Sequence, residues 1–108
     1  MARFLNFWHF NPSAPWPTDP SKLLELYEMM FASMDGMIKK GEIEEWGAFH
    51  DGYSGYVIGK GETADSYKRV LIFSPYVVSD VHEIISYEKA KETIRAVLKA
   101  KIAAMKKK

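Results

Sequence analysis

The segment Arg3–Phe10 constrains the fold of this chain more than any other part of the sequence. It reads RFLNFWHF and is closed by Asn11-Pro12, so it is too short for a globular helix and has the aromatic content of a strand. Alternation places Leu5, Phe7 and His9 on one side, and Phe4, Asn6, Trp8 and Phe10 on the other. Bulk on both sides is typical of a central strand, so we expect both faces of the sheet to need cover.

A proline-rich connection and a long helix follow this strand. Residues 11–20 contain four prolines, which fix the backbone and favour an ordered but irregular segment. Asp19-Pro20 is a good helix start, and apolar residues then recur at helical spacing up to Ile38, before Lys39-Lys40-Gly41. The pattern predicts a helix over residues 20–40.

Residues 43–60 have the pattern of a β-hairpin. Asp51-Gly52 is a two-residue turn signal between two strand-like runs. If the turn closes there, Trp46 faces Val57 and Ala48 faces Gly55 on one side of the hairpin. The opposite side then pairs Gly47 with Tyr56 and Glu45 with Ile58. The glutamates at 42, 44 and 45 suit an edge strand, where charge discourages pairing with other chains.

The last third of the chain predicts a helix, a strand and a second long helix. Residues 63–73 suit a helix with Ala64, Tyr67, Val70 and Leu71 facing inward, although the run 70–73 also suits a strand. Residues 76–85 alternate as a strand does. Ser86 can then cap a final helix with an inward apolar stripe, formed by Ala90, Ile94, Val97, Leu98, Ile102 and Met105.

This order of elements, β-α-β-β-α-β plus a C-terminal helix, predicts one α+β domain over residues 1–108. It is the ferredoxin-like plan, with four antiparallel strands in spatial order 4-1-3-2 and helices on one face. The other face carries apolar side chains of the first strand, and an uncovered patch of that kind marks an interface. We therefore expect a homodimer through the sheet face, with the last helix packed across or swapped onto the partner.

With this order the chain resembles the dimeric α+β barrel superfamily. The stretches WPTDP at 16–20, GEIEEWG at 41–47 and VHEI at 81–84 look most like small members of that group without an assigned activity. The resemblance implies a cavity between sheet and helices. It also implies a role for Asn6, since an Asn on the first strand recurs in active sites of monooxygenase-type and haem-degrading members. Haem-degrading members carry a His on the second helix, and residues 62–73 contain none, which argues against haem.

Composition and charge exclude several classes of function. The 108 residues include no cysteine, so disulfide scaffolds, thiolate nucleophiles and cysteine-based metal sites are excluded. The net charge of +1 is unlike that of a dedicated nucleic-acid binder, and we expect no nucleic-acid partner. No apolar run approaches the ~20 residues of a membrane span, so we expect a soluble, cytoplasmic protein without a membrane partner. The charge is uneven: residues 86–108 carry +6 and residues 1–85 carry −5.

Asn6, Trp8, Trp46 and His82 are the candidate cavity residues. Asn6 needs a hydrogen-bond partner if it is buried, so it either meets one in the protein or faces a pocket. His9 and His82 fall on strands that the predicted order makes neighbours, but nothing here has a recognised metal-ligand spacing. The three histidines can be structural, line a cavity or bind a metal. We expect no metal and no cofactor.

Other features leave packing and binding open as alternatives. Trp46 shares a face with Ala48, Gly55 and Val57, and the small residues leave room for a pocket or for a packed helix. Methionines at 29, 30, 34 and 37 can form plain core, or line an adaptable pocket or dimer interface. Trp16 among prolines can be a lid over a cavity, part of a polyproline-type recognition segment, or the anchor of a loop.

Three functions follow as alternatives. The first is a small dimeric barrel of unassigned activity that binds a small molecule between sheet and helices. The second is a cofactor-independent enzyme of the monooxygenase or isomerase type, with the four candidate residues in its cavity. The third is an interaction module that uses the basic C-terminal helix, which carries Lys91, Arg95 and Lys99 beside the apolar stripe.

Overall fold

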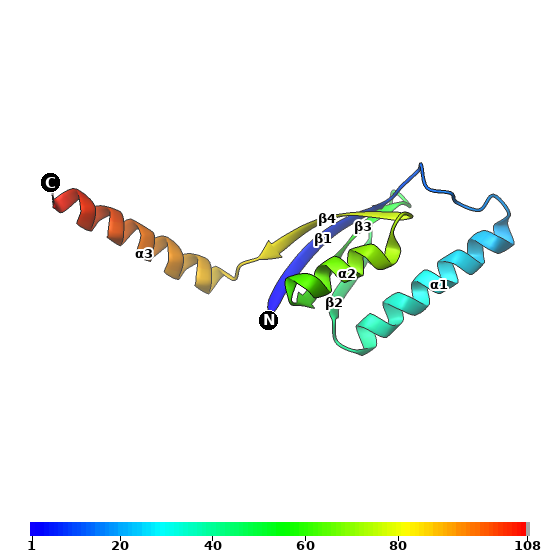
Figure 1. The fold of residues 1–108 in the computed structure, drawn as a ribbon, viewed down its shortest axis with the longest axis horizontal. Helices are drawn as coiled ribbons and strands as arrows, with labels where there is room; N and C mark the ends of the chain where they lie inside the picture. The colour runs from blue at the N-terminus through cyan, green and yellow to red at the C-terminus, as the bar shows by residue number, and fades with distance from the viewer. Residues whose placement is uncertain (108) are drawn as a thin grey trace.

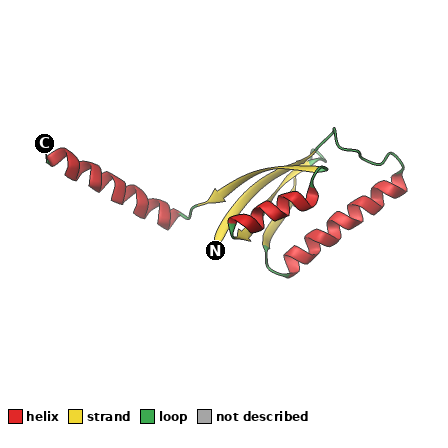
Figure 2. Cartoon of the chain, in the orientation of Figure 1, coloured by secondary structure: helices red, strands yellow, loops and turns green. Residues whose placement is uncertain are grey.

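A computed structural model describes residues 1–107 and shows an α+β fold of four strands and three helices. The strands are β1 (Ala2–Phe10), β2 (Ile43–Ala48), β3 (Ser54–Gly61) and β4 (Val77–Ile84). The helices are α1 (Pro20–Lys39), α2 (Thr63–Phe73) and α3 (Tyr87–Lys106). Figure 2 shows how these strands and helices alternate along the chain.

The four strands form one antiparallel sheet in the order β2-β3-β1-β4. Counted from its other edge, the same sheet runs β4-β1-β3-β2, and β1 is a central strand. Helices α1 and α2 lie on one face of the sheet, whereas the opposite face, called here the open face, carries no helix of the described chain (Figure 1). The arrangement is compatible with a ferredoxin-like plan.

The hairpin keeps the predicted register, but its turn is wider than the two-residue turn expected at Asp51-Gly52. Gly52 N–H donates to the carbonyl of Phe49 at 3.3 Å, and only the glycine of the pair has a positive φ. Trp46 pairs with Val57, Ala48 with Gly55 and Gly47 with Tyr56, as predicted, and a register shift follows between Ile43 and Glu45. The Asp51 carboxylate accepts hydrogen bonds from the backbone N–H groups of Tyr53, at 2.9 Å, and Ser54, at 3.1 Å. The side chain of Asp51 therefore holds the turn that sets the register.

Helix α1 begins and ends at the expected signals. The Asp19 side chain accepts a hydrogen bond from the backbone of Ser21 at 3.2 Å, and Pro20 occupies the first turn. The helix stops at Lys39, one residue short of the predicted end, and Gly41 then adopts a φ of 79°, in the left-handed region that favours glycine.

Helix α2 presents a different face to the sheet from the one expected. Ala64, Tyr67 and Leu71 are exposed, so their expected inward position was wrong, whereas Ser66 is buried and Arg69, Val70 and Phe73 are half-buried. A glycine in β3 explains why α2 is rotated about its axis relative to the expected position, because Gly59 leaves room for the long Arg69 side chain to lie against the strand. A Cβ at Gly59 would lie only 2.7 Å from the Arg69 guanidinium.

Helix α3 begins as predicted but does not pack against its own chain. The Ser86 hydroxyl caps it by accepting a hydrogen bond from the backbone of Lys89 at 3.2 Å. Within the described chain no residue of α3 is buried, and the helix projects from the end of β4 (Figure 1). The molecule is therefore elongated, with extents of 71 × 29 × 25 Å. The predicted stripe is not inward in the single chain, because α3 has no surface of its own to cover.

No helix within residues 1–107 has the length and apolar character needed to cross a bilayer.

Candidate binding cavity

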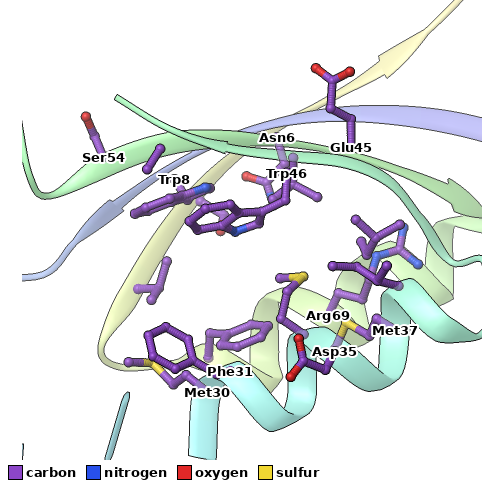
Figure 3. A pocket seen from close by; sticks show the side chains of 18 of the residues that line it. Asn6, Trp8, Met30, Phe31, Asp35, Met37, Glu45, Trp46, Ser54 and Arg69 are labelled. Carbon is purple, nitrogen blue, oxygen red and sulfur yellow. The ribbon is translucent and has the colours of Figure 1, made fainter. Parts of the chain in front are cut away.

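A cavity of about 700 Å³ lies between the sheet and α1. Its size falls within the range of small-molecule sites. Figure 3 shows the two indole rings on the sheet side and α1 side chains across from them. Aromatic and methionine side chains form a large part of its lining, chiefly Trp8, Trp46 and Phe10 from the sheet and Tyr27, Met30, Phe31 and Met34 from α1.

The sheet side of the cavity is built by a tryptophan over a glycine. Trp8 pairs with Gly55 across the β1–β3 ladder, and a Cβ at Gly55 would collide with the Trp8 indole. Glycine at this position therefore lets the indole lie flat across the neighbouring strand. Trp46 from β2 stacks on Trp8 with ring centroids 5.5 Å apart and an interplanar angle of 21°. Of this pair, Trp8 is buried and Trp46 is 43 % exposed.

Aromatic contacts continue from the sheet to α1 through the proline-rich connection. Phe10 lies 5.6 Å from Trp8, 5.2 Å from Trp16 and 5.9 Å from Tyr27, measured between ring centroids. The Trp16 indole N–H also donates a hydrogen bond to the carbonyl of Asn11 at 2.6 Å. Trp16 therefore anchors its loop to the sheet and to α1, which is the last of the three roles considered for it.

Two buried polar atoms lie in the wall of the cavity. Among residues 1–107, Asn6 Oδ1 and Trp8 Nε1 have no hydrogen-bond partner. Both side chains belong to residues that line the cavity. A buried polar group left without a partner costs about 1–3 kcal/mol, so each of these atoms would be stabilised by a polar group that reached it.

Ionisable side chains also line this largely apolar space. Asp35 contributes from α1 and Arg69 from α2. Arg69 also donates a hydrogen bond to the carbonyl of Lys60 at 3.2 Å, which ties α2 to the end of β3. Glu45, although its residue lies at the cavity rim, points its side chain away from the cavity (Figure 3).

The structure brings together three of the four candidate residues. Asn6, Trp8 and Trp46 line the same cavity. His82 lies on the open face instead, because its position in β4 pairs with Leu5 rather than with a cavity-facing residue of β1. There it lies 3.2 Å from the Asp80 carboxylate, and its ring meets Phe7 edge-on at 6.2 Å.

The other histidines are also separate from the cavity. His9 alternates onto the open face with Phe7, and His50 lies in the hairpin turn. Within residues 1–107 no group of three or more His, Asp or Glu side chains is arranged to hold a metal ion.

Sequence reasoning missed the polar residues that the helices contribute to the cavity. Asp35 and Arg69 interrupt apolar helical patterns, and the rotated face of α2 is what turns Arg69 inward. The methionines gave a usable signal, because Met30, Met34 and Met37 share a helical face and all three line the cavity, whereas Met29 is exposed.

Comparisons of the chain with protein-family models, with curated proteins and with solved structures give no match.

Proposed function

We propose that this chain is a ferredoxin-like domain of the dimeric α+β barrel type that binds a small, mostly apolar molecule between its sheet and helices. The observation that carries the proposal is the cavity of about 700 Å³ with two unpartnered polar atoms, Asn6 Oδ1 and Trp8 Nε1, in its wall. Cavities of this size, with apolar walls and few polar groups, are the usual form of small-molecule sites.

The two atoms specify the polar part of the ligand. Trp8 Nε1–H needs an acceptor and Asn6 Oδ1 needs a donor, and a hydroxyl group is both. The stacked indoles and the methionines of α1 favour a flat apolar body. The ligand class is therefore a flat aromatic molecule that carries a hydroxyl.

Entry of such a ligand requires Trp46 to move. Asn6 Oδ1 and Trp8 Nε1 are buried in the absence of a ligand, and the Trp46 indole stacks on Trp8. Because Trp46 lies on an edge strand and is 43 % exposed, its side chain can rotate at less cost than a buried ring. In this proposal Trp46 swings aside, and the ligand hydroxyl lies in the plane of the Trp8 indole, where Nε1–H can donate to it.

A pair of matched compounds tests the site. 2-Naphthol has the proposed shape and hydroxyl, whereas naphthalene lacks only the hydroxyl. We expect calorimetry to show tighter binding of 2-naphthol by roughly 5- to 10-fold, the equivalent of about one hydrogen bond. The variant Asn6→Leu should remove that preference without loss of stability, because it also removes an unpartnered polar atom. Native mass spectrometry of freshly purified protein would show whether a ligand is already bound.

The controls separate a ligand contact from an internal one. Phe7→Leu on the open face should leave both affinities unchanged. If Asn6 and Trp8 instead bond to each other in solution, Asn6→Leu will lower the stability and leave the preference for 2-naphthol intact. Failure of both compounds to bind saturably would reject the cavity as a site for this class of molecule.

A homodimer through the open face is the second part of the proposal. Phe7 is 42 % exposed and Val78 is 41 % exposed on this face, beside the half-buried Leu5, Tyr56 and Ile58. A second copy is the simplest cover, because a two-fold interface needs only a surface that matches itself. Light scattering should give twice the chain mass, and Phe7→Glu should shift the protein toward the monomer. A monomeric wild-type chain would reject the dimer.

A cofactor-independent enzyme of the monooxygenase or isomerase type is the second candidate function. Asp35 favours it, because this exposed residue also lines the cavity and its carboxylate can act as a general base toward a bound ligand. Asn6→Ala should then leave the fold intact, as seen by circular dichroism, and abolish turnover of an aromatic or quinone-like substrate. Turnover equal to that of the wild type would remove this candidate.

A further inference from the structure

Helix α3 carries an apolar stripe that its own chain does not cover. The side chains of Ile94, Leu98 and Ile102 are each more than half exposed. They follow the three- and four-residue spacing of one helix face, together with Ala90, Val97 and Met105. A helix with one apolar face is stabilised mainly by packing that face, so α3 is built to contact another surface.

The charge of α3 disfavours a second α3 as its partner surface. Residues 86–108 carry a net charge of +6, so pairing two such helices would bring like charges together. Residues 1–85 carry −5. The body of this same protein therefore offers a surface of complementary charge for α3.

The edge of the sheet at β2 has the matching composition. It is defined here as the β2 edge, residues 42–53. Exposed glutamates lie at 42, 44 and 45, of which Glu44 pairs with Arg3 at 2.8 Å and Glu45 accepts a hydrogen bond from the Tyr56 hydroxyl. Three aromatic side chains are also exposed, namely Trp46 at 43 %, Phe49 at 44 % and Tyr53 at 60 %. Proteins commonly cover such an edge strand with a helix, since its backbone groups are otherwise unpaired.

Within one chain α3 cannot reach the β2 edge. Strands β4 and β2 form opposite edges of the sheet, and only Ile85 and Ser86 separate β4 from α3. Ser86 is extended, with φ −67° and ψ 157°, and α3 leads away from the sheet (Figure 1). The acidic, aromatic edge and the basic, apolar helix can therefore meet only between two copies.

We propose that α3 of each chain packs along the β2 edge of a second copy, so that two copies exchange their C-terminal helices. The apolar stripe covers the exposed aromatics, and the lysines and Arg95 lie near the glutamates. The inference rests on the homodimer proposed above and adds which segments form it. Because Trp46 belongs to both the cavity and the β2 edge, the exchanged helix also contacts the side chain that covers the ligand site.

Matched variants on two faces of α3 test the stripe. Ile94→Gln with Leu98→Gln should weaken dimerisation more than about 10-fold, because two apolar side chains lose their buried contacts. Ala96→Gln with Ala103→Gln adds the same groups to the opposite face and should leave the dimer unchanged. Both proteins should fold, since these side chains are exposed in the single chain.

Energy transfer between copies tests where the helix docks. The chain has no cysteine, so a single label can be placed through Ala100→Cys on α3 or through His50→Cys in the hairpin turn. Donor on α3 of one preparation and acceptor on the turn of another should give strong transfer upon mixing. Donor and acceptor placed on α3 of both preparations should give weaker transfer.

The outcomes distinguish this inference from the dimer itself. A dimer that survives Ile94→Gln with Leu98→Gln, and shows no transfer between α3 and the turn, overturns the exchange but keeps the open-face dimer. A monomer at all concentrations overturns both. A monomer that binds a DNA duplex with a steep salt dependence would assign the basic helix to a different partner.

Discussion

Gly47 lies directly beneath the ring of Tyr56 in the β2–β3 ladder, and a Cβ there would collide with that ring. We expect Gly47→Ala to lower the free energy of unfolding by about 1–3 kcal/mol, because the ring must shift to make room. Gly36→Ala is the matched control, since no described atom lies within 4 Å of its Cβ position in α1. The control should raise stability by about 0.5–1 kcal/mol. Urea denaturation measures both, and equal effects would contradict the close contact.

The hydroxyl of the same Tyr56 donates a hydrogen bond to the Glu45 carboxylate, which raises the pKa of Tyr56 above its ordinary value. Because the folded state favours the protonated phenol, this contribution to stability is present below the ordinary tyrosine pKa and is lost as the pH rises through the raised value. Glu45→Gln should bring the pKa of Tyr56 back down. Resonances of ¹³C-labelled tyrosine followed against pH would show the change, and an unmoved pKa would exclude the bond.

His82 shows why single side chains are hard to place from sequence. The hairpin register followed from a local turn, so Trp46 could be placed on the same face as Val57 without the structure. No turn joins β1 to β4, and a shift of one residue in their pairing moves every side chain of β4 to the other face. The observed pairing of His82 with Leu5 puts it on the open face.

At the scale of elements, the hairpin depends on the Asp51 side chain. A hydrogen bond from the Ser54 hydroxyl, with further bonds from the backbone of Tyr53 and Ser54, lowers the pKa of Asp51. Because the pKa of Asp51 is lower in the folded protein, its ionised carboxylate stabilises the fold at pH values above the ordinary pKa of aspartate. This stabilisation is lost as the pH falls through the pKa of Asp51 in the folded protein. Asp51→Ala should be less stable than the wild type near neutral pH, and the difference should shrink in acid. A constant difference across thermal melts at several pH values would argue against the carboxylate.

Local signals predicted the bounds of the elements but not how their faces are used. Asp19, Gly41 and Ser86 mark helix ends in the sequence, and the structure confirms each of them. The facing of α2 depends on Gly59, which lies in another element and admits Arg69 against the sheet. The width of the cavity is not predictable from local signals either. It depends on how far α1 lies from the sheet, which the residue pattern within α1 does not determine.

At the scale of the whole molecule, the single chain buries few apolar side chains. The buried hydrophobic residues of the described chain are Phe4, Trp8, Met37, Ile43 and Val57. If α3 and the open face are covered by a second copy, association contributes to the stability of the fold. We therefore expect the melting temperature to rise with protein concentration, by several degrees over a broad range. The rise should be lost in the variant with Ile94→Gln and Leu98→Gln, and calorimetry at several concentrations would measure it.

The proline-rich connection between β1 and α1 limits how far the helix can move from the sheet. Its prolines restrict the backbone, and Trp16 fastens it to Phe10 on the sheet and Tyr27 on the helix. The connection is therefore rigid, and it holds the N-terminal half of α1 close to the strands. If the proposed ligand binds between sheet and helix, the width available to it is therefore limited by main chain that cannot rotate aside as a side chain can.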